Sequence, residues 1–244
     1  MKRARQPTIG NQSHAGYDRL APMYRTLESI LFANRLQEAR VALIEALPTI
    51  ESALFFGDGD GRLLNVFATR FPNCLITSVD QSRRMLDLQQ KRFPDHTVTG
   101  RQTLIQANAL DYHPPPGQFD LLVCSFFLDC FSESELARAI PQWLSALRPD
   151  GLLYFVDFRI PESGWRRLRG RCLSWLMHRF FRHSTGLKNR GLPDFESLFA
   201  SHDLDIVADA DTRCASDTGT RCAIDSMCVC RIYRMVKNET GLRP

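Results

Sequence analysis

A glycine-rich turn between two differently patterned segments constrains the fold of this chain most strongly. Residues 52–56 form a short apolar run, and Gly57, Gly59 and Gly61 follow it at alternate positions. Residues 63–71 then carry apolar side chains at helical spacing. Glycine allows a sharp turn and a close approach of the backbone to a ligand, because it has no Cβ. This order predicts the first strand, turn and helix of an open α/β sheet, with a ligand site at the carboxyl end of the strand.

The rest of the chain continues this alternation of apolar runs and helical segments. Strands are predicted over 52–56, 74–79, 104–107, 119–126, 152–158, 204–208 and 227–236, and helices over 27–47, 63–71, 82–92, 136–147 and 193–202. Ser82 has the position of an N-cap, and Ser132 with Glu135 has capping-box spacing. Strands and helices that alternate in this way form a doubly wound, mostly parallel sheet with right-handed crossovers.

The spacing of the glycines distinguishes between two classes of cofactor. A dinucleotide fingerprint has the form Gly-x-Gly-x-x-Gly, and Arg62 stands where its third glycine would be. Asp58 and Asp60 would also repel a pyrophosphate, whereas they would attract a sulfonium cation that carries an α-amino group. A nicotinamide-dependent oxidoreductase is therefore the less favoured function. A tight turn that binds no ligand remains the structural alternative.

Polar residues also end the next two predicted strands. Asp80 follows the second strand, 19 residues after Gly61, where a carboxylate can accept hydrogen bonds from both ribose hydroxyls of an adenosyl group. The alternative for Asp80 is a turn residue or a carboxylate at the start of a helix. Asn108 and Ala109 end the third strand, where a side-chain amide and a backbone N–H can bind the edge of an adenine. Together these positions predict an adenosyl site.

The order of these motifs resembles that of the class I S-adenosylmethionine (SAM)-dependent methyltransferases, over roughly residues 17–158. The three glycines fall on the glycine motif of that family. The other matching segments are the ribose motif at 80–86, the fourth strand at 119–125, the turn before the fifth strand at 147–151, and a lid of the ubiquinone/menaquinone-biosynthesis type at 17–24.

The resemblance implies a Rossmann-like, seven-stranded, mostly parallel doubly wound sheet with an antiparallel C-terminal strand. It implies SAM as cofactor and methyl transfer to a small or lipophilic acceptor. One domain is expected over 17–244, with lid helices over 17–50, after a flexible segment over 1–16. The residues expected to bind the cofactor are Tyr24, Gly57, Asp58, Gly59, Gly61, Asp80, Gln81, Asn108, Ala109 and Ser125.

Two positions depart from the family pattern. The family usually has an acidic residue two positions before the first glycine, where this chain has Phe55, and Asn108 stands in place of the acid after the third strand. We therefore hypothesise that Asp58, inside the loop, binds the ammonium group of the cofactor. The departures also keep open a non-catalytic protein that has the fold but binds the cofactor weakly.

The catalytic residue is predicted from its position, because the methyl donor is already activated and the protein mainly aligns the reactants. A general base is needed only when the acceptor arrives protonated. Asp129 lies in the loop after the fourth strand, which should face the methyl group, among Phe126, Phe127 and Phe131. Such apolar neighbours raise the pKa of a carboxyl group. The alternative for Asp129 is a turn or capping role, and Asp157 is the second candidate base.

A basic amphipathic insertion over 162–192 is the other informative segment. It is interpreted as a lid helix over the acceptor pocket, as a peripheral contact with an anionic membrane through 163–183, or as a contact with an anionic partner such as RNA. The net charge of +4 does not by itself require a nucleic acid, and we expect none.

The cysteines bear on metal binding and location. The eight cysteines form no Cys-x-x-Cys pair, so we expect no metal site and a reducing, cytoplasmic location. The basic N-terminus is not followed by an apolar run, which does not fit a secretory signal. The apolar runs are also too short to span a bilayer. The sequence does not indicate an oligomeric state.

Overall fold

The computed structural model describes residues 35–93, 101–159, 192–202, 204–210 and 228–235. Within these residues the strands are β1 Ser52–Phe56, β2 Leu75–Asp80, β3 Gln102–Gln106, β4 Phe119–Ser125, β5 Leu147–Phe158, β6 Leu204–Asp209 and β7 Cys228–Met235. The helices are α2 Arg35–Val41, α3 Arg62–Arg70, α4 Arg83–Arg92, α5 Glu133–Leu144 and α7 Phe195–Ala200, and short 3-10 turns cover Ile44–Ala46 and Leu128–Cys130.

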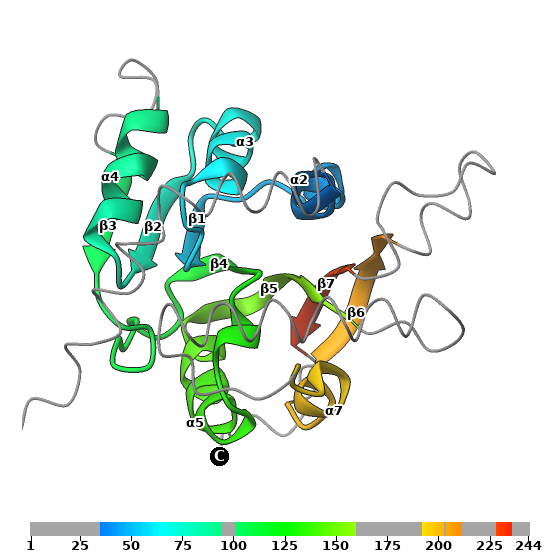
Figure 1. The fold of residues 1–244 in the computed structure, drawn as a ribbon. Helices are drawn as coiled ribbons and strands as arrows, with labels where there is room; N and C mark the ends of the chain where they lie inside the picture. The colour runs from blue at the N-terminus through cyan, green and yellow to red at the C-terminus, as the bar shows by residue number, and fades with distance from the viewer. Residues whose placement is uncertain (1–34, 94–100, 160–191, 203, 211–227, 236–244) are drawn as a thin grey trace, which may run out of the picture.

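The strands form one sheet in the order β3-β2-β1-β4-β5-β7-β6 (Figure 1). The first five strands pair in parallel, and β7 lies antiparallel between β5 and β6. The predicted fold class, a seven-stranded and mostly parallel α/β sheet with an antiparallel C-terminal strand, is confirmed. Because β1 pairs with both β2 and β4, the strand order reverses at β1, and ligands bind outside the carboxyl ends of strands at such a point.

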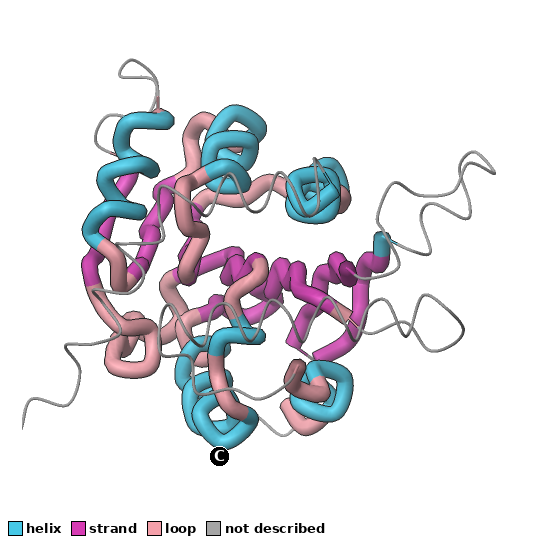
Figure 2. Tube along the Cα trace, in the orientation of Figure 1, coloured by secondary structure: helices cyan, strands magenta, loops and turns pink. Residues whose placement is uncertain are grey.

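Helices cover both faces of the sheet (Figures 1 and 2), with α2, α3 and α4 on one face and α5 and α7 on the other. Successive side chains of a strand point to opposite faces, so β1 is buried on both sides. The ring of Phe55 packs 5.2 Å from that of Phe67 in α3, and the ring of Phe56 lies 4.9 Å from that of Trp143 in α5. Phe55, at the position of the family's usual acid, is therefore a core residue.

Local capping fixes the starts of two helices. Ser82 caps α4 by accepting a hydrogen bond from the backbone N–H of Met85 at 3.3 Å. Ser132 and Glu135 form a reciprocal capping box at the start of α5. Both predicted caps are confirmed.

The predicted helix over 27–47 is interrupted within its described part. Helix α2 ends at Val41, and a separate 3-10 turn follows over Ile44–Ala46. The N–H of Leu43 donates to the buried hydroxyl of Tyr154 in β5 at 3.2 Å, and that hydroxyl donates to the carbonyl oxygen of Arg40 at 2.8 Å. These bonds to the sheet replace helical bonds at the end of α2, and the helical periodicity does not reveal them.

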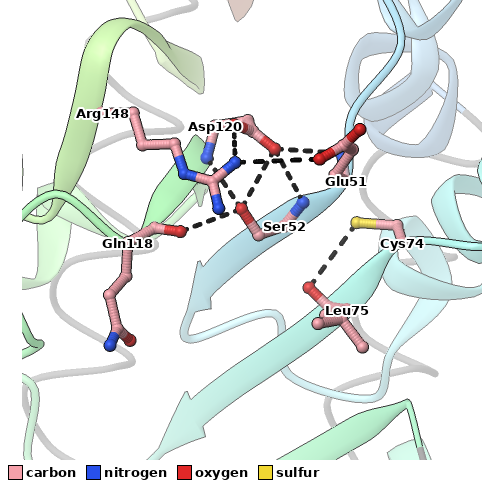
Figure 3. Close-up of polar contacts among 7 residues, drawn as sticks. All are labelled: Glu51, Ser52, Cys74, Leu75, Gln118, Asp120 and Arg148. Carbon is pink, nitrogen blue, oxygen red and sulfur yellow. Dashed lines mark hydrogen bonds and ion pairs between the residues drawn. The ribbon is translucent and has the colours of Figure 1, made fainter.

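A polar cluster joins the amino ends of β1, β4 and β5, at the edge opposite the glycine loop (Figure 3). Asp120 Oδ2 accepts hydrogen bonds from the N–H groups of Glu51 and Ser52 and from the Ser52 hydroxyl, at 2.9 to 3.0 Å. Asp120 Oδ1 accepts from Arg148 at 2.8 Å. Burial disfavours the charged carboxylate, but these hydrogen bonds outweigh it and hold the pKa of Asp120 below its ordinary value.

Replacing Asp120 with Ala is expected to lower the free energy of unfolding by about 2 kcal/mol at pH 7, because partly buried donors lose their acceptor. The folded pKa of Asp120 is lowered, so its contribution is complete above the unfolded value near pH 4 and is lost as the pH falls through the folded pKa. Urea unfolding from pH 8 to pH 3 measures this difference. A difference that is the same at all these pH values would contradict the charged network, and the exposed Asp87→Ala change serves as control.

Candidate functional site

The first two glycines of the loop after β1 have φ angles of +60°, in the left-handed region that favours glycine. A Cβ at Gly57 would overlap the ring of Phe127, whereas a Cβ at Gly59 would meet no heavy atom within 4 Å. Gly57 therefore accommodates a neighbouring side chain. Gly59 borders open space, as a backbone that receives a ligand would.

The carboxyl group of Asp58 points to the start of α3, where Oδ2 accepts the N–H of Leu64 at 3.1 Å. Desolvation raises the pKa of Asp58 to about 7, and the charges of Asp60 and Asp80 also act to raise it. The Leu64 hydrogen bond and the positive charge of Arg40 act in the opposite direction. Asp58 can therefore gain or lose a proton near neutral pH, and a bound cation would favour its charged form.

The charge of Asp60 is neutralised by neighbouring arginines, which the sequence interpretation did not predict. Its carboxylate forms ion pairs with Arg62 at 3.1 Å and with Arg92 at 2.7 Å. Asp60 is therefore compensated within the protein, so the electrostatic argument against a pyrophosphate in this loop rests on Asp58.

Asp80 lies at the carboxyl end of β2, beside the glycine loop. Its side chain is largely buried, and Oδ1 accepts the N–H of Ser82 at 2.8 Å. The N–H of Gly57 donates to the carbonyl of Val79 at 2.9 Å, which keeps the two predicted motifs adjacent. Gln81 is the next residue, and its carbonyl accepts from the Gln106 side chain at 3.4 Å.

The loop after β3 uses the Asn108 side chain for its own turn. Asn108 Oδ1 accepts the N–H of Leu110, and Nδ2 donates to Asp111, both at 3.1 Å. The carbonyl of Ala109 accepts the indole N–H of Trp143 in α5 at 3.2 Å. Adenine contacts by Asn108 and Ala109 stay a prediction, and Trp143 is a supporting residue that the sequence interpretation missed.

Ser125 is the last residue of β4, and its buried hydroxyl is not hydrogen-bonded within the described part of the chain. The residue is 5% exposed. Buried polar groups are normally hydrogen-bonded, so an unpartnered hydroxyl at the carboxyl edge of the sheet fits a polar group of a ligand. With the open space at Gly59 and the carboxyl group of Asp80, the residues at this edge suit an adenosyl cofactor that bears an amino-acid group.

The predicted base, Asp129, lies on a turn that is hydrogen-bonded to strand β5. Asp129 belongs to the 3-10 turn Leu128–Cys130, and its N–H donates to Asp157 Oδ2 at 3.3 Å. Asp157 is completely buried in β5, and its Oδ1 accepts the N–H of Phe158 at 2.8 Å. Desolvation and the neighbouring charge of Asp129 raise the pKa of Asp157 well above its ordinary value. Asp129 is therefore the more accessible of the two candidate bases, and Asp157 supports its loop.

An aromatic cluster, defined as Phe56, Tyr112, Phe127, Phe131 and Trp143, connects these loops. Ring centroids lie 4.9 Å apart for Phe127 and Phe131, and 6.0 Å apart for Phe127 and Trp143. The cluster joins the end of β1, the loop after β3 and the Asp129 turn in one packed unit. Phe127 also lies against Gly57, a contact that the local sequence pattern does not predict.

Several predicted features lie outside the described residues. These are the segment 1–16, Tyr24 with the lid residues before Arg35, and residues 162–191 of the insertion. In the described ranges, no helix combines the length and apolar character that a membrane span requires. The same ranges contain no group of three His, Cys, Asp or Glu residues suited to a metal ion.

Comparisons with known proteins agree with the motifs. A family model described as a methyltransferase domain matches residues 53–151. The chain is 31% identical over 116 residues to the trans-aconitate 2-methyltransferase of Paracidovorax citrulli, which covers 47% of this chain and 40% of that protein. It is 24% identical over 163 residues to the demethylmenaquinone methyltransferase of Thermotoga maritima. That alignment covers 66% of this chain and 67% of the relative.

A solved structure shows the same fold. The mitomycin 7-O-methyltransferase MmcR superimposes with a TM-score of 0.60 at 16% identity, over 89% of this chain and 60% of that one. This chain thus spans 40% of the length of the first curated relative and two thirds of the second. The family model and the curated relatives match by sequence, and MmcR matches by fold. Residues 53–151 of the chain thus match a methyltransferase domain, and the chain is similar by sequence to methyltransferases, one of which is named for demethylmenaquinone.

Proposed function

We propose that this chain transfers a methyl group from SAM to a small or lipophilic acceptor. The observation that carries the proposal is the buried, unpartnered hydroxyl of Ser125, at the carboxyl edge where the glycine loop and the Asp129 turn meet. SAM, when bound, supplies an electrophilic methyl group on a sulfonium. The curated relatives carry the names of methyltransferases for a carboxylic acid and for a quinone, which supports an acceptor of one of these two kinds.

We assign separate residues to the adenosyl part and to the amino-acid part of the cofactor. Asp80 accepts the ribose hydroxyls, with Gln81 beside it, and Asn108 and Ala109 bind the adenine. Asp58 binds the ammonium group, because its carboxyl group is desolvated and a neighbouring cation would stabilise its charged form. The remaining proposed contacts come from Gly57, Gly59, Gly61, Ser125 and Tyr24.

Ligand-dependent stabilisation tests this function most directly. We expect SAM and its demethylated product to raise the thermal unfolding midpoint, since both bind the folded state, and NAD to leave it unchanged. Stabilisation by NAD alone would favour the nicotinamide-dependent oxidoreductase. Stabilisation by both sulfur nucleosides without turnover on either kind of acceptor would favour the non-catalytic binding protein.

Asp129 is the proposed general base, acting through its carboxylate on an acceptor that arrives protonated. We expect Asp129→Asn to lower kcat by about 100-fold on a demethylmenaquinone-type acceptor, because general bases contribute at least that factor. On trans-aconitate, whose carboxylates are already ionised at neutral pH, the same change should leave kcat within a few-fold. Formation of the demethylated cofactor measures both rates.

Full turnover of the Asp129→Asn variant on the protonated acceptor would remove the base assignment. The control is Asp87→Asn, because Asp87 is an exposed carboxylate whose recorded partner is Arg83 on the surface of α4. SAM affinity measured in parallel separates a loss of base function from a loss of cofactor binding.

A lipophilic acceptor also gives a reason for the basic insertion. We propose a cytoplasmic protein with peripheral membrane contact through 163–183. Co-sedimentation with anionic liposomes should fall when Arg166, Arg167 and Arg169 are replaced by neutral residues. Equal sedimentation of both forms would instead favour a lid that covers the acceptor pocket.

A further inference from the structure

Helix α4 contacts the glycine loop through the fully buried side chain of Gln89. Gln89 Nε2 donates to the carbonyl of Gly59 at 2.9 Å, and Oε1 accepts the hydroxyl of Ser78 at 2.8 Å. Ser78 is itself fully buried in β2. The amide of Gln89 is therefore bonded at both ends and turns the Gly59 carbonyl toward α4.

Arg92, one helical turn further along α4, holds the next peptide. Its Nε donates to the carbonyl of Asp60 at 2.8 Å, and its Nη2 pairs with Asp60 Oδ2 at 2.7 Å. Arg62 pairs with the other carboxylate oxygen at 3.1 Å. Asp60 is thus fixed by its backbone and by its side chain.

The third glycine of the loop allows this close contact with α4. A Cβ at Gly61 would lie 3.1 Å from the Cα of Gln89 and 3.0 Å from its Cγ, closer than ordinary van der Waals contact. The start of α3 therefore packs directly against α4. The conformation of the loop depends on this packing as well as on its glycines.

The orientation of the Gly59 carbonyl has a consequence for the ligand side of the loop. In a trans peptide the N–H of the following residue points opposite to the carbonyl, so the N–H of Asp60 points away from α4. Among the described residues this N–H has no hydrogen-bond partner. A backbone N–H held in this way can donate to an anionic group such as the carboxylate of an amino acid.

We propose that Gln89 and Arg92 are positioning residues for the cofactor. Gln89 draws the Gly59 carbonyl toward α4 and so presents the N–H of Asp60 to the amino-acid end of SAM, while Arg92 holds Asp60 in place through its carbonyl and its carboxylate. The inference rests on the proposed SAM-dependent function. It gives two residues of α4 a role in cofactor affinity, although their side chains contact the loop rather than the ligand.

Calorimetry with SAM and with its demethylated product tests this role in Gln89→Met and Arg92→Met variants. Each variant should raise both dissociation constants by about tenfold, the cost of one well-oriented hydrogen bond. The KM for SAM should rise by a similar factor, while kcat at saturating SAM stays within twofold, because the acceptor side is unchanged.

Two matched controls separate positioning from general stability. Leu86→Ala removes a buried apolar side chain from the same helix, and Arg83→Met removes an exposed arginine from it. Both controls should bind SAM like the wild type, even where Leu86→Ala lowers the unfolding midpoint as much as Gln89→Met does.

Dissociation constants for SAM within twofold of the wild-type value in both Gln89→Met and Arg92→Met would overturn the inference. A loss of affinity in Leu86→Ala equal to that in Gln89→Met would also overturn it. If Gln89→Met does not fold, Arg92→Met decides between these outcomes. Absence of SAM binding in the wild type would overturn the proposed function itself, and the positioning role with it.

Discussion

Replacing Asp58 with Asn is expected to stabilise the free protein at pH 8 and to weaken its binding of SAM. Desolvation raises the folded pKa of Asp58 to about 7, whereas the same group in the unfolded chain has the ordinary value of 3.8. Each pKa unit corresponds to about 1.4 kcal/mol, so the charged form costs roughly 2 to 4 kcal/mol at pH 8. Asn keeps an acceptor for the N–H of Leu64 and removes that cost.

The sign of the pH dependence follows from the raised pKa. Between about pH 4 and pH 7 the folded state binds the Asp58 proton more tightly than the unfolded state, so wild-type stability falls as the pH rises through this window. The stability gained by Asp58→Asn should therefore be small at pH 4, grow up to pH 7 and stay constant above it. Urea unfolding at a series of pH values measures this difference.

Cofactor affinity should change in the opposite direction. The proposed ammonium partner is the ionised carboxylate, so wild-type affinity for SAM should rise from pH 5.5 to pH 7 as Asp58 loses its proton. The Asn variant should bind SAM about tenfold more weakly at pH 7.5, because a charge-assisted hydrogen bond is lost, and its affinity should vary little with pH. Calorimetry in buffers of different ionisation enthalpy would also detect proton release by the wild type.

Unchanged SAM affinity in Asp58→Asn would refute the ammonium assignment. The stability prediction is separate, because it depends only on the desolvation of the carboxyl group. Asp87→Asn is the control for both measurements, since Asp87 is exposed and forms an ion pair with Arg83 at the surface.

Local pattern was sufficient to predict most of the helices and strands and to place Asp80 at the carboxyl edge of the sheet. The caps at Ser82 and Ser132 depend on contacts three residues away, so the sequence contains the whole signal. Asp80 was predicted from its place at the end of the second strand, and Ser125 from the resemblance to the methyltransferases; the carboxyl ends of parallel strands meet at one edge of the sheet. Neither placement required knowledge of how the helices pack.

Long-range contacts are the part that the sequence did not reveal. The ring of Phe127 lies against Gly57, and the Gln89 amide bonds to the carbonyl of Gly59, across 70 and 30 residues of chain. Such contacts depend on the rotamers and packing angles of helices on a sheet, which apolar periodicity does not specify. Asp60 is the clearest example, because its ion pair with Arg92 joins residues 32 positions apart and leaves no trace in the local sequence pattern.

The contact between Gly57 and Phe127 leads to a prediction with a matched pair of variants. Gly57 and Gly59 have the same φ of +60°, but only a Cβ at Gly57 would overlap a side chain. Left-handed backbone costs a non-glycine residue about 1 to 2 kcal/mol, and overpacking adds about 1 to 3 kcal/mol. Phe127 cannot move aside at low cost, because it is packed against Phe56 and Trp143.

Gly57→Ala is therefore expected to lower the free energy of unfolding by about 3 kcal/mol, and Gly59→Ala by about 1 kcal/mol, as measured by urea unfolding. SAM affinity should show the reverse order in calorimetry, because the Cβ at Gly59 enters the open space assigned to the cofactor. Adding Phe127→Leu to Gly57→Ala should restore part of the lost free energy of unfolding, because Phe127 lies against Gly57. Adding Phe127→Leu to Gly59→Ala should restore none, because a Cβ at Gly59 would not meet Phe127. Equal stability losses in the two glycine variants, or rescue of both by Phe127→Leu, would show that backbone strain alone decides the behaviour of this loop.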